Sequence, residues 1–239
     1  MVADALGTAM LDYQRDELGE CRYVDGEETQ DGHIHENYFT PREEWDQASI
    51  DRHRSLPDPI LDVGCGAGQH LCFFQDLGKE AVGIDVSPGA VQAARERGAE
   101  DVRVGDMFEL RSDVERDAFR TVLLNGTQLG LAHSFAGVRS LLSDLAHVTD
   151  EDGVAAVDNY DATEVDEELF GYRPDPRDGV AHRTFHFEYE PRDGERIQGR
   201  ALHFLLFSPD RLRDVCVGTP WSVSAVHHRG VYYKAHLEK

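Results

Sequence analysis

Three aspartates stand at or just beyond the ends of successive short apolar segments. Asp62 lies in "ILDV", Asp85 ends "AVGID", and Asp106 follows the valines of "VRVGDMF". A carboxylate accepts hydrogen bonds from hydroxyl and amino groups and balances a positive charge. Each aspartate alone is typical of a solvated turn. Because the carboxyl ends of parallel strands meet at one edge of a sheet, where open α/β sheets bind ligands, we expect the three to surround one ligand.

A glycine-rich turn, "GCGAG", lies between the first two aspartates and contains Gly64, Gly66 and Gly68. Glycine permits tight backbone geometry and lets a ligand approach the main chain. The dinucleotide fingerprint G-x-G-x-x-G would need a glycine at position 69, where Gln69 stands. A carboxylate at Asp62 would also repel a pyrophosphate. The turn therefore favours a ligand that has no phosphate and carries a positive charge.

Apolar segments alternate with helix signals from residue 60 onwards. The predicted strands are 60–63, 81–84, 102–104, 121–124 and 153–157, and the predicted helices are 67–77, 87–97 and 134–148. This alternation indicates a parallel sheet covered by helices on both faces. Later segments predict a hairpin (182–190 and 200–208), a helix start (208–216) and a closing antiparallel pair (221–229 and 231–239). Residues 1–50 are polar and irregular, apart from a helix predicted around Ala3 to Leu18.

Four segments resemble, in order and spacing, the first four motifs of class I S-adenosylmethionine-dependent methyltransferases: "LDVGCGAGQH", "AVGIDVSPGAVQAAR", "VRVGDMFEL" and "TVLLNGTQLGL". The resemblance is strong over about 60–160. It implies an α/β, Rossmann-like, doubly wound seven-stranded sheet, mostly parallel with an antiparallel last strand, plus an inserted β-hairpin cap. We expect an N-terminal cap segment at 1–50 and a methyltransferase domain at 51–239. A substrate-cap insertion is expected at about 161–207, joined by the aromatic-rich residues 31–46.

The resemblance also implies S-adenosylmethionine as the cofactor, with S-adenosylhomocysteine as its product. The residues that it assigns to the cofactor are Asp62, Gly64, Cys65, Gly66 and Gly68 at the methionine part, Asp85 at the ribose with Val86 next to it in the chain, Asp106 and Met107 at the adenine, Asn125 and Gly126 beneath the methyl group, and Tyr38 as an upstream aromatic over the cofactor.

Methyl transfer from a sulfonium needs the acceptor atom and the methyl group held in line at about 3 Å. A general base is needed only where the acceptor must lose a proton. The candidates that follow or overhang strand ends are His133, Asp158, Tyr160 and His186, and for each a packing or surface role stays open.

The segment "LLNGTQLG" lacks the Asn/Asp-Pro-Pro-aromatic signature of enzymes that methylate amino groups of DNA bases, so we expect a small-molecule acceptor. Its identity, its acceptor atom and the oligomeric state stay open. Two alternatives remain: a non-catalytic S-adenosylmethionine-binding regulatory module, and an NAD-type oxidoreductase, which Asp62 and Gln69 oppose.

Composition narrows the class of protein further. No basic stripe is visible, which disfavours nucleic acid as a partner, and no apolar stretch approaches eighteen residues, so we expect no membrane span and a cytoplasmic location. Cys21, Cys65, Cys72 and Cys216 form no CxxC pair, and the pair His33 and His35 has no second pair to complete a metal site. No metal is expected.

The charge balance predicts a salt-adapted, halophilic protein. Acidic residues number 46 against 24 Lys plus Arg, giving −22. Lysine is confined to Lys79, Lys234 and Lys239. Such an excess destabilises the compact state by self-repulsion, which about 1 M salt screens within about 3 Å. A basic partner is the alternative, although the carboxylates are spread along the whole chain.

We therefore expect the melting temperature to fall progressively when salt is diluted below about 0.5 M, because the acidic surface loses its screening. Thermal unfolding over a salt series measures this. A melting temperature that does not respond to salt would contradict the interpretation.

Overall fold

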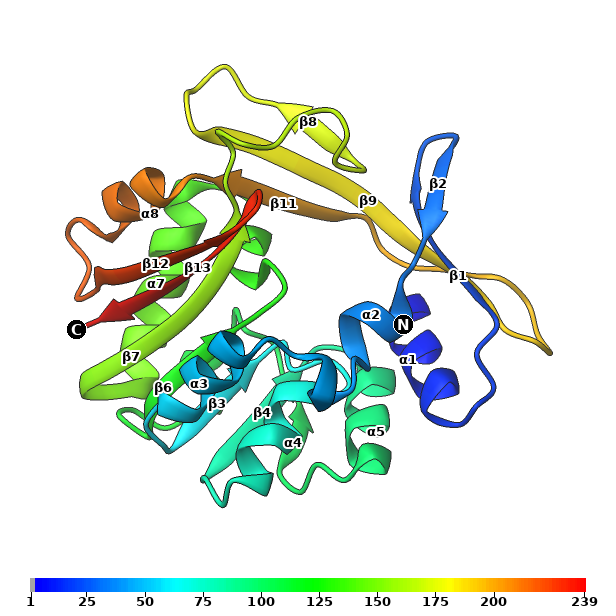
Figure 1. Cartoon of the computed structure of the whole chain (residues 1–239), viewed down its shortest axis with the longest axis horizontal. Coiled ribbons are helices and arrows are strands. Elements are labelled where there is room, and N and C mark those ends of the chain that lie inside the picture. The colour runs from blue at the N-terminus through cyan, green and yellow to red at the C-terminus, as the bar shows by residue number, and fades with distance from the viewer. Residues whose placement is uncertain (1–2) are drawn as a thin grey trace.

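Seven strands form one sheet whose carboxyl edge carries the three aspartates (Figure 1). The computed structural model describes residues 3–239. In spatial order the strands are β12 (Ser222–Arg229), β13 (Tyr232–Glu238), β7 (Thr149–Tyr160), β6 (Phe119–Leu124), β3 (Ile60–Val63), β4 (Ala81–Asp85) and β5 (Val102–Val104). The last five run parallel, and β13 lies antiparallel between β7 and β12. The predicted sheet, with its antiparallel last strand, is confirmed.

Helices cover both faces of this sheet. Apolar residues of α7 (Phe135–Val148) and α8 (Pro209–Cys216) belong to the core on one face, and those of α4 (Gln69–Asp76) to the core on the other. The remaining helices are α1 (Ala5–Gln14), α2 (Ile34–Tyr38), α3 (Gln47–Ser55), α5 (Pro88–Arg97), α6 (Leu110–Asp113) and the 3-10 turns η1 (Arg42–Glu44) and η2 (Gln128–Ala132). Ser87 caps α5 by accepting from the Ala90 amide, and proline follows it at the first helical position, which is the signal that predicted this helix.

A second sheet stands over the carboxyl edge, and we call it the cap sheet. Its central strand is β9 (Val180–Glu190), which pairs with β1 (Glu20–Asp25), β8 (Tyr172–Pro174), β10 (Ile197–Gln198) and β11 (Leu202–Phe207), while β1 also pairs with β2 (Glu28–Asp31). The predicted hairpin is therefore present. The expectation that residues 1–50 are irregular beyond one helix was wrong, because β1 and β2 complete this sheet. All four residues of β2 are exposed, so its sequence has no apolar alternation to reveal it.

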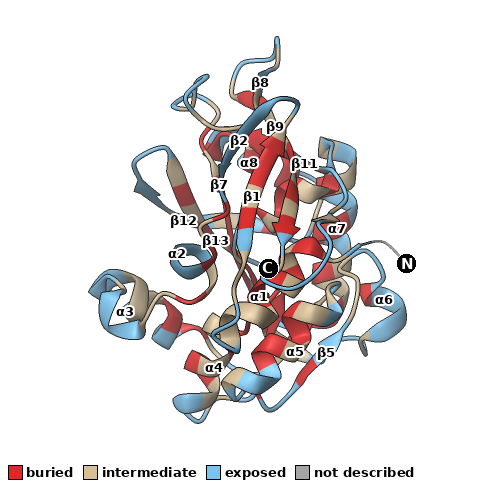
Figure 2. Cartoon of the chain, turned by 90° about the vertical axis from the view of Figure 1, so that its right-hand side faces the viewer, coloured by how far each residue is buried: buried red, intermediate tan, exposed pale blue. Residues whose placement is uncertain are grey.

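Helix α1 joins the cap sheet to the α/β core by packing on α5. The Asp4 carboxylate accepts from the amides of Gly7 and Gly89 and from the Ser87 hydroxyl. Figure 2 shows α1 beneath the cap sheet and beside α5, and buried residues of all three form one apolar cluster. The two helices approach so closely that a Cβ on Gly89 would lie 2.5 Å from the Gly7 carbonyl carbon.

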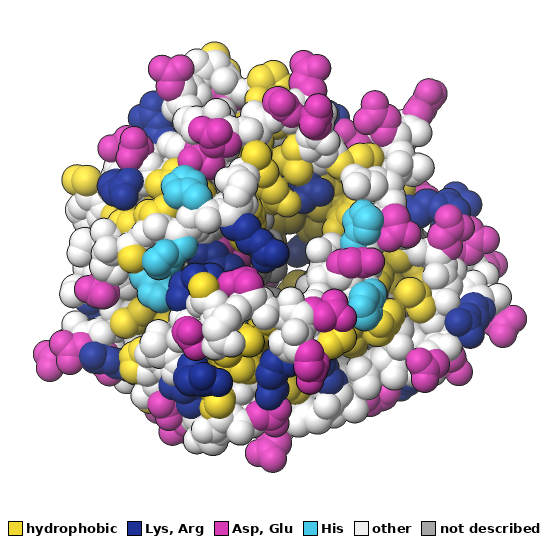
Figure 3. Space-filling view, in the orientation of Figure 1, with side chains coloured by type: hydrophobic (Ala, Val, Ile, Leu, Met, Phe, Trp, Pro, Cys, Tyr) yellow, Lys and Arg dark blue, Asp and Glu magenta, His cyan; other side chains and the backbone are white. Residues whose placement is uncertain are grey.

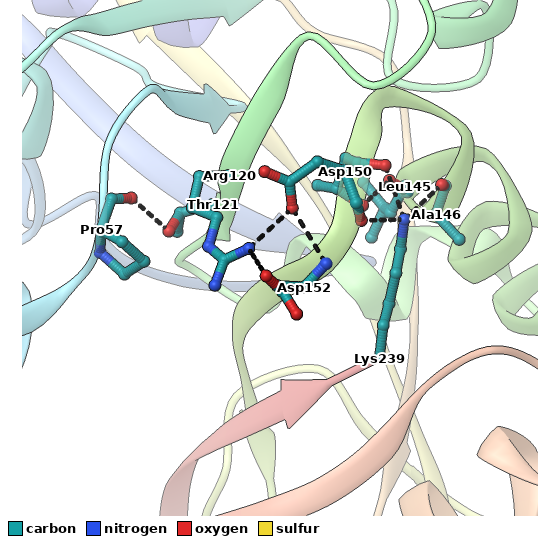
Figure 4. A network of polar contacts seen from close by, with 9 residues as sticks. Pro57, Arg120, Thr121, Leu145, Ala146, Asp150, Asp152 and Lys239 are labelled. Atoms are coloured by element: carbon teal, nitrogen blue, oxygen red, sulfur yellow. Dashed lines mark hydrogen bonds and ion pairs between the residues drawn. The ribbon is translucent and has the colours of Figure 1, made fainter.

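Polar contacts fasten the opposite edge of the large sheet (Figure 4). Arg120 Nη1 lies 3.0 Å from carboxylate oxygens of both Asp150 and Asp152. Lys239 Nζ donates to the carbonyl oxygens of Ala146, Thr149 and Asp150 at 2.6–2.7 Å. These contacts tie the start of β7 to β6 and to the end of β13, away from the aspartates. The edge that carries the aspartates is therefore left free of this clamp.

Replacing Gly89 by alanine tests the packing of α1 on α5. The added Cβ meets backbone rather than a movable side chain, so we expect Gly89→Ala to lower the free energy of unfolding by about 1–3 kcal/mol. Urea unfolding in molar salt measures it. Gly105→Ala is the control, because its Cβ would make ordinary contact at 3.4 Å with Ile84. Equal stability of the two variants would contradict the close packing.

Candidate active site

The glycine turn leaves β3 and is held against β4. The amides of Gly64 and Cys65 donate to the carbonyl oxygen of Ile84 at 2.8 and 3.0 Å. Gly64, Gly66 and Gly68 have φ values of 72°, 54° and 74°, which side chains other than glycine rarely adopt. The Cys65 side chain is buried. The glycine pattern in the sequence is thus explained by backbone conformation, and the turn lies at the carboxyl edge with residues 65–68 buried.

Asp85, the last residue of β4, holds this turn in place. Its Oδ2 accepts from the Gly66 amide at 2.9 Å and its Oδ1 from the Ser87 amide at 2.8 Å. Burial raises the pKa of this carboxyl, and the two backbone hydrogen bonds oppose the rise. A carboxylate has about four acceptor positions, so each oxygen can still accept from a ligand hydroxyl.

Asp62 is buried in the centre of the sheet and lacks a complete set of partners. It is 2% exposed, and its Oδ2 has no hydrogen-bond partner within residues 3–239. Burial, followed by the negative charge of Asp85, raises the pKa of the Asp62 carboxyl to about 7. An unpaired buried oxygen is costly, and a cationic donor beside it would remove that cost.

Apolar side chains surround the third aspartate at the ends of β4 and β5. Val86, Val104 and Phe108 are 48%, 54% and 47% exposed, and Met107 is half-buried. Asp106 accepts from the Phe108 amide at 2.9 Å. These residues offer an apolar surface with one carboxylate, which suits a flat ring that carries an amino group.

Tyr38 lies over the glycine turn, as a ring placed to cover a ligand would. Its Cδ1 is 3.5 Å from the position that a Cβ on Gly66 would take, and Met10 Cε is 3.7 Å from it. Arg97 donates to the Tyr38 carbonyl at 2.8 Å and fixes the end of α2. Burial raises the pKa of the Tyr38 hydroxyl well above its ordinary value. The phenol is therefore a neutral hydrogen-bonding group at ordinary pH.

The segment after β6 is organised by Asp158 and Lys234. Asp158 Oδ2 and Oδ1 accept from the amides of Gly126 and Thr127 at 2.9 and 2.7 Å. Lys234 Nζ donates to Asn125 Oδ1 at 3.3 Å, and the Asn125 Nδ2 is buried without a partner within the described residues. Asp158 thus positions the backbone beneath the predicted methyl group, whereas the sequence suggested it as a general base.

The other three candidate bases do not gather around the glycine turn. His133 is exposed and lies beside the carbonyl oxygen of His203 at 2.7 Å. His186 lies on the cap sheet, where its Nε2 is 3.1 Å from Gln198 Nε2. Tyr160, at the carboxyl end of β7, packs against Tyr232 with ring centres 5.2 Å apart. Tyr160 is therefore the candidate nearest the space between the two sheets.

The sequence analysis did not identify Tyr23 and Arg183, two residues that the cap sheet brings to this space. Tyr23 of β1 and Arg183 of β9 meet there, 5.5 Å from ring centre to guanidinium carbon. Figure 3 shows this face hollowed near its centre, in the region that β7, β9 and α2 border in Figure 1, with Lys and Arg side chains gathered at the hollow. Tyr23 and Arg183 are brought together by the pairing of β1 with β9, and no local sequence pattern predicts this pairing.

Two classes of feature are absent from residues 3–239. No three histidine, cysteine, aspartate or glutamate side chains are grouped so as to hold a metal ion. None of the helices in that range has both the length and the apolar character needed to span a bilayer.

The glycine turn and the three aspartates lie in a stretch that resembles known proteins. A family profile described as "Methyltransferase domain" matches residues 60–158, which contain all of them. Residues 60–158 therefore form a methyltransferase domain. A solved S-adenosylmethionine-dependent methyltransferase from Bacteroides fragilis, in complex with S-adenosyl-L-homocysteine, superposes on the protein with a TM-score of 0.76. It is 20% identical and the match covers 98% of this chain and 94% of that one, so the methyltransferase fold extends over the cap sheet as well.

Curated relatives match less than half of the chain. The uncharacterized methyltransferase YcgJ of Bacillus subtilis is 30% identical over 106 residues, which are 42% of this chain and 40% of the relative. A probable cobalt-precorrin-6B C(15)-methyltransferase of Methanobrevibacter smithii is 32% identical over 65 residues, 27% of this chain and 34% of the relative. The chain thus matches 34–40% of the length of these two relatives.

Replacing Asp62 by asparagine tests the unpaired carboxyl of this methyltransferase domain. The pKa of Asp62 is about 7 in the folded protein against an ordinary value of 3.8, so the folded state holds an extra proton between these pH values. The wild type therefore has its full free energy of unfolding below about pH 4. It loses part of it as pH rises through about 7 and the buried carboxyl ionises. Asparagine does not titrate. We therefore expect the free energy of unfolding of Asp62→Asn, relative to the wild type, to rise by about 4 kcal/mol between pH 4 and pH 8, at about 1.4 kcal/mol for each pKa unit.

Urea unfolding at several pH values in molar salt measures the difference. Asp193→Asn, on an exposed turn of the cap sheet, controls for the loss of one charge. A stability difference between Asp62→Asn and the wild type that stays constant with pH would show that Asp62 does not titrate in this range.

Proposed function

We propose that the protein transfers a methyl group from S-adenosylmethionine to a small-molecule acceptor. The observation that carries the proposal is the buried Asp62 oxygen without a partner beside the glycine turn. A phosphate-bearing dinucleotide would set like charges against it, whereas S-adenosylmethionine carries a sulfonium and an ammonium group and no phosphate. This supports S-adenosylmethionine over NAD as the cofactor.

The residues present fit this cofactor along its whole length. We propose that Asp62 and the turn at Gly64–Gly68 receive the methionine part, and that Asp85 accepts from the ribose hydroxyls while it holds the turn. Val86, Met107 and Phe108 would cover the adenine, with Asp106 at its amino group. Tyr38 would close over the cofactor, since its ring already lies against Gly66.

The chemical work of the chain is to bind and to align. When bound, S-adenosylmethionine supplies a methyl carbon activated by its positive sulfur. That carbon would pass to the acceptor atom, and sulfur would keep the electron pair of the broken carbon–sulfur bond. Asn125 and Gly126, which Lys234 and Asp158 hold by hydrogen bonds, would keep the reacting groups in line. Tyr160 is the one of the four proposed bases that borders the acceptor space.

A small-molecule acceptor agrees with the charge and the architecture. The net charge of −22 opposes approach to a nucleic acid backbone. The cap sheet encloses the carboxyl edge rather than leaving it flat, as an enzyme for a small acceptor requires. We propose that the enzyme acts in a salt-rich cytoplasm, because its acidic residues are distributed over the whole chain.

Replacing Asp85 by alanine tests the cofactor site. The variant loses hydrogen bonds to a charged group, so we expect S-adenosylhomocysteine to bind about 1–3 kcal/mol more weakly. Calorimetry in molar salt measures this affinity. Asp101→Ala, which removes an exposed carboxylate just before β5, is the matched control. Unchanged affinity of Asp85→Ala would contradict the ribose role.

Incubation of wild-type protein with labelled S-adenosylmethionine and fractionated cell extract tests the transfer itself. We expect label in a small molecule that mass spectrometry can identify. Binding of S-adenosylhomocysteine without label in any fraction would point to a non-catalytic regulatory module. Binding of NAD in place of S-adenosylhomocysteine would overturn the proposed function.

A further inference from the structure

Arg183 packs its guanidinium among three aromatic rings where the two sheets meet. The guanidinium carbon lies 4.6 Å from the ring centre of Phe185, 5.5 Å from Tyr23 and 5.8 Å from Tyr160. These rings come from β9, β1 and the carboxyl end of β7. Nε donates to the Phe170 carbonyl at 2.9 Å. Rings and carbonyl together hold the guanidinium in one place and spend only one of its five donors.

The two terminal nitrogens of Arg183 have no hydrogen-bond or ion-pair partner among the residues that the structure describes. Within residues 3–239 its one hydrogen bond is the one from Nε, and it forms no ion pair with a carboxylate. Neither terminal nitrogen is among the buried polar atoms that lack a partner, so both are open to solvent although the residue is half-buried. The guanidinium therefore presents a free edge with four N–H donors.

Other arginines of the cap region show that carboxylates are available there. Arg173 Nη2 lies 2.7 Å from a carboxylate oxygen of Asp25, and Arg177 Nη2 lies 2.7 Å from one of Asp175. In a chain with 46 acidic residues and 24 lysines and arginines, Arg183 still has no acidic partner among the described residues. Arg97 is also half-buried without one, and it donates to the Tyr38 carbonyl. A packing role for Arg183 would explain the rings, but it leaves the open edge unexplained.

Tyr38 connects this open edge to the glycine turn. Burial is the main cause that raises the pKa of the Tyr38 hydroxyl, the charge of Asp85 adds to the rise, and the charge of Arg183 opposes it. The hydroxyl thus lies within electrostatic reach of both residues, while its ring borders Gly66. Tyr38 also packs against the apolar cluster that contains Tyr23 and Phe185, two of the rings around Arg183.

We propose that Arg183 binds a carboxylate of the methyl acceptor, so that the substrate is a small carboxylic acid. The planar edge of a guanidinium matches the two oxygens of a carboxylate in parallel hydrogen bonds. One guanidinium balances one negative charge, which favours a monoanion over a dianion such as a phosphate monoester. The rings of Tyr23 and Phe185 would pack against the body of the acid. This inference rests on the proposed function and names its substrate class.

Matched pools of candidate acceptors test the proposal. One pool contains amino and hydroxy carboxylic acids, including glycine and 4-hydroxybenzoate, and the other contains the same compounds as primary amides. With labelled S-adenosylmethionine, we expect wild-type protein to label a member of the acid pool and to leave its amide unlabelled. Equal labelling of acid and amide, labelling of amides alone, or no labelling of either pool overturns the proposal.

Variants of Arg183 then test the residue itself. For the labelled acid, we expect Arg183→Leu to raise KM about 10- to 100-fold with little change in kcat, and Arg183→Lys to lie between it and the wild type. Arg196→Leu, at an exposed arginine of the same sheet, should match the wild type. An unchanged KM in Arg183→Leu overturns the proposal, and if that variant fails to fold, the KM of Arg183→Lys decides.

Calorimetry with S-adenosylhomocysteine separates this inference from the proposed function. We expect the same affinity in the wild type and in the Arg183 variants, because the ring contacts and the side-chain hydrogen bond of Arg183 involve neither the glycine turn nor Asp85. Absence of binding to the wild type would sink the proposed function. Intact binding without any preference for acids would sink only the substrate class.

Discussion

One carboxylate connects the parts on which the site depends. Asp85 ends β4, yet it accepts from the amide of Gly66, in the turn that leaves β3. That bond fixes the turn relative to two strands at once, and the turn in turn supports the ring of Tyr38. The same carboxylate is one cause of the raised pKa of Asp62, so the acidity of the buried oxygen also depends on it. The position of the glycine turn and the pKa of Asp62 therefore both depend on the Asp85 side chain.

The lysines and the arginines of the protein make different kinds of contact. Each of its three lysines gives its ammonium group to an oxygen: Lys79 to a carbonyl, Lys239 to three carbonyls and Lys234 to the Asn125 amide. Most ion pairs are made by arginine, whose planar group suits carboxylates. Arg183 makes no ion pair within residues 3–239. Three aromatic rings and one carbonyl hold it between the cap sheet and the carboxyl end of β7.

Local sequence predicted the elements whose determinants are local. The strands at 60–63 and 102–104 agree with β3 and β5, and the Ser-Pro start of α5 was visible because a cap and a fixed φ act within one turn. Strand β2 was not predictable because all four of its residues are exposed, and β1 was not predictable because its partner β9 lies far along the chain. For the same reason Arg183 went unnoticed. A position at a strand end also could not show that Asp85 and Asp158 each accept hydrogen bonds from two backbone amides.

The cap sheet imposes an order on the assembly of the molecule. Gly19 hydrogen-bonds Tyr189, 170 residues later, and β1 has no large-sheet neighbour to pair with beforehand. At a synthesis rate of about 5–20 residues per second, the first strand must wait on the order of ten seconds or more for β9 to leave the ribosome. Closing so long a loop is entropically costly and slow. The five parallel strands of the large sheet can thus pair first, whereas β13 and β12 follow β9 and β11 in the chain and join that sheet only after the strands of the cap sheet have been made.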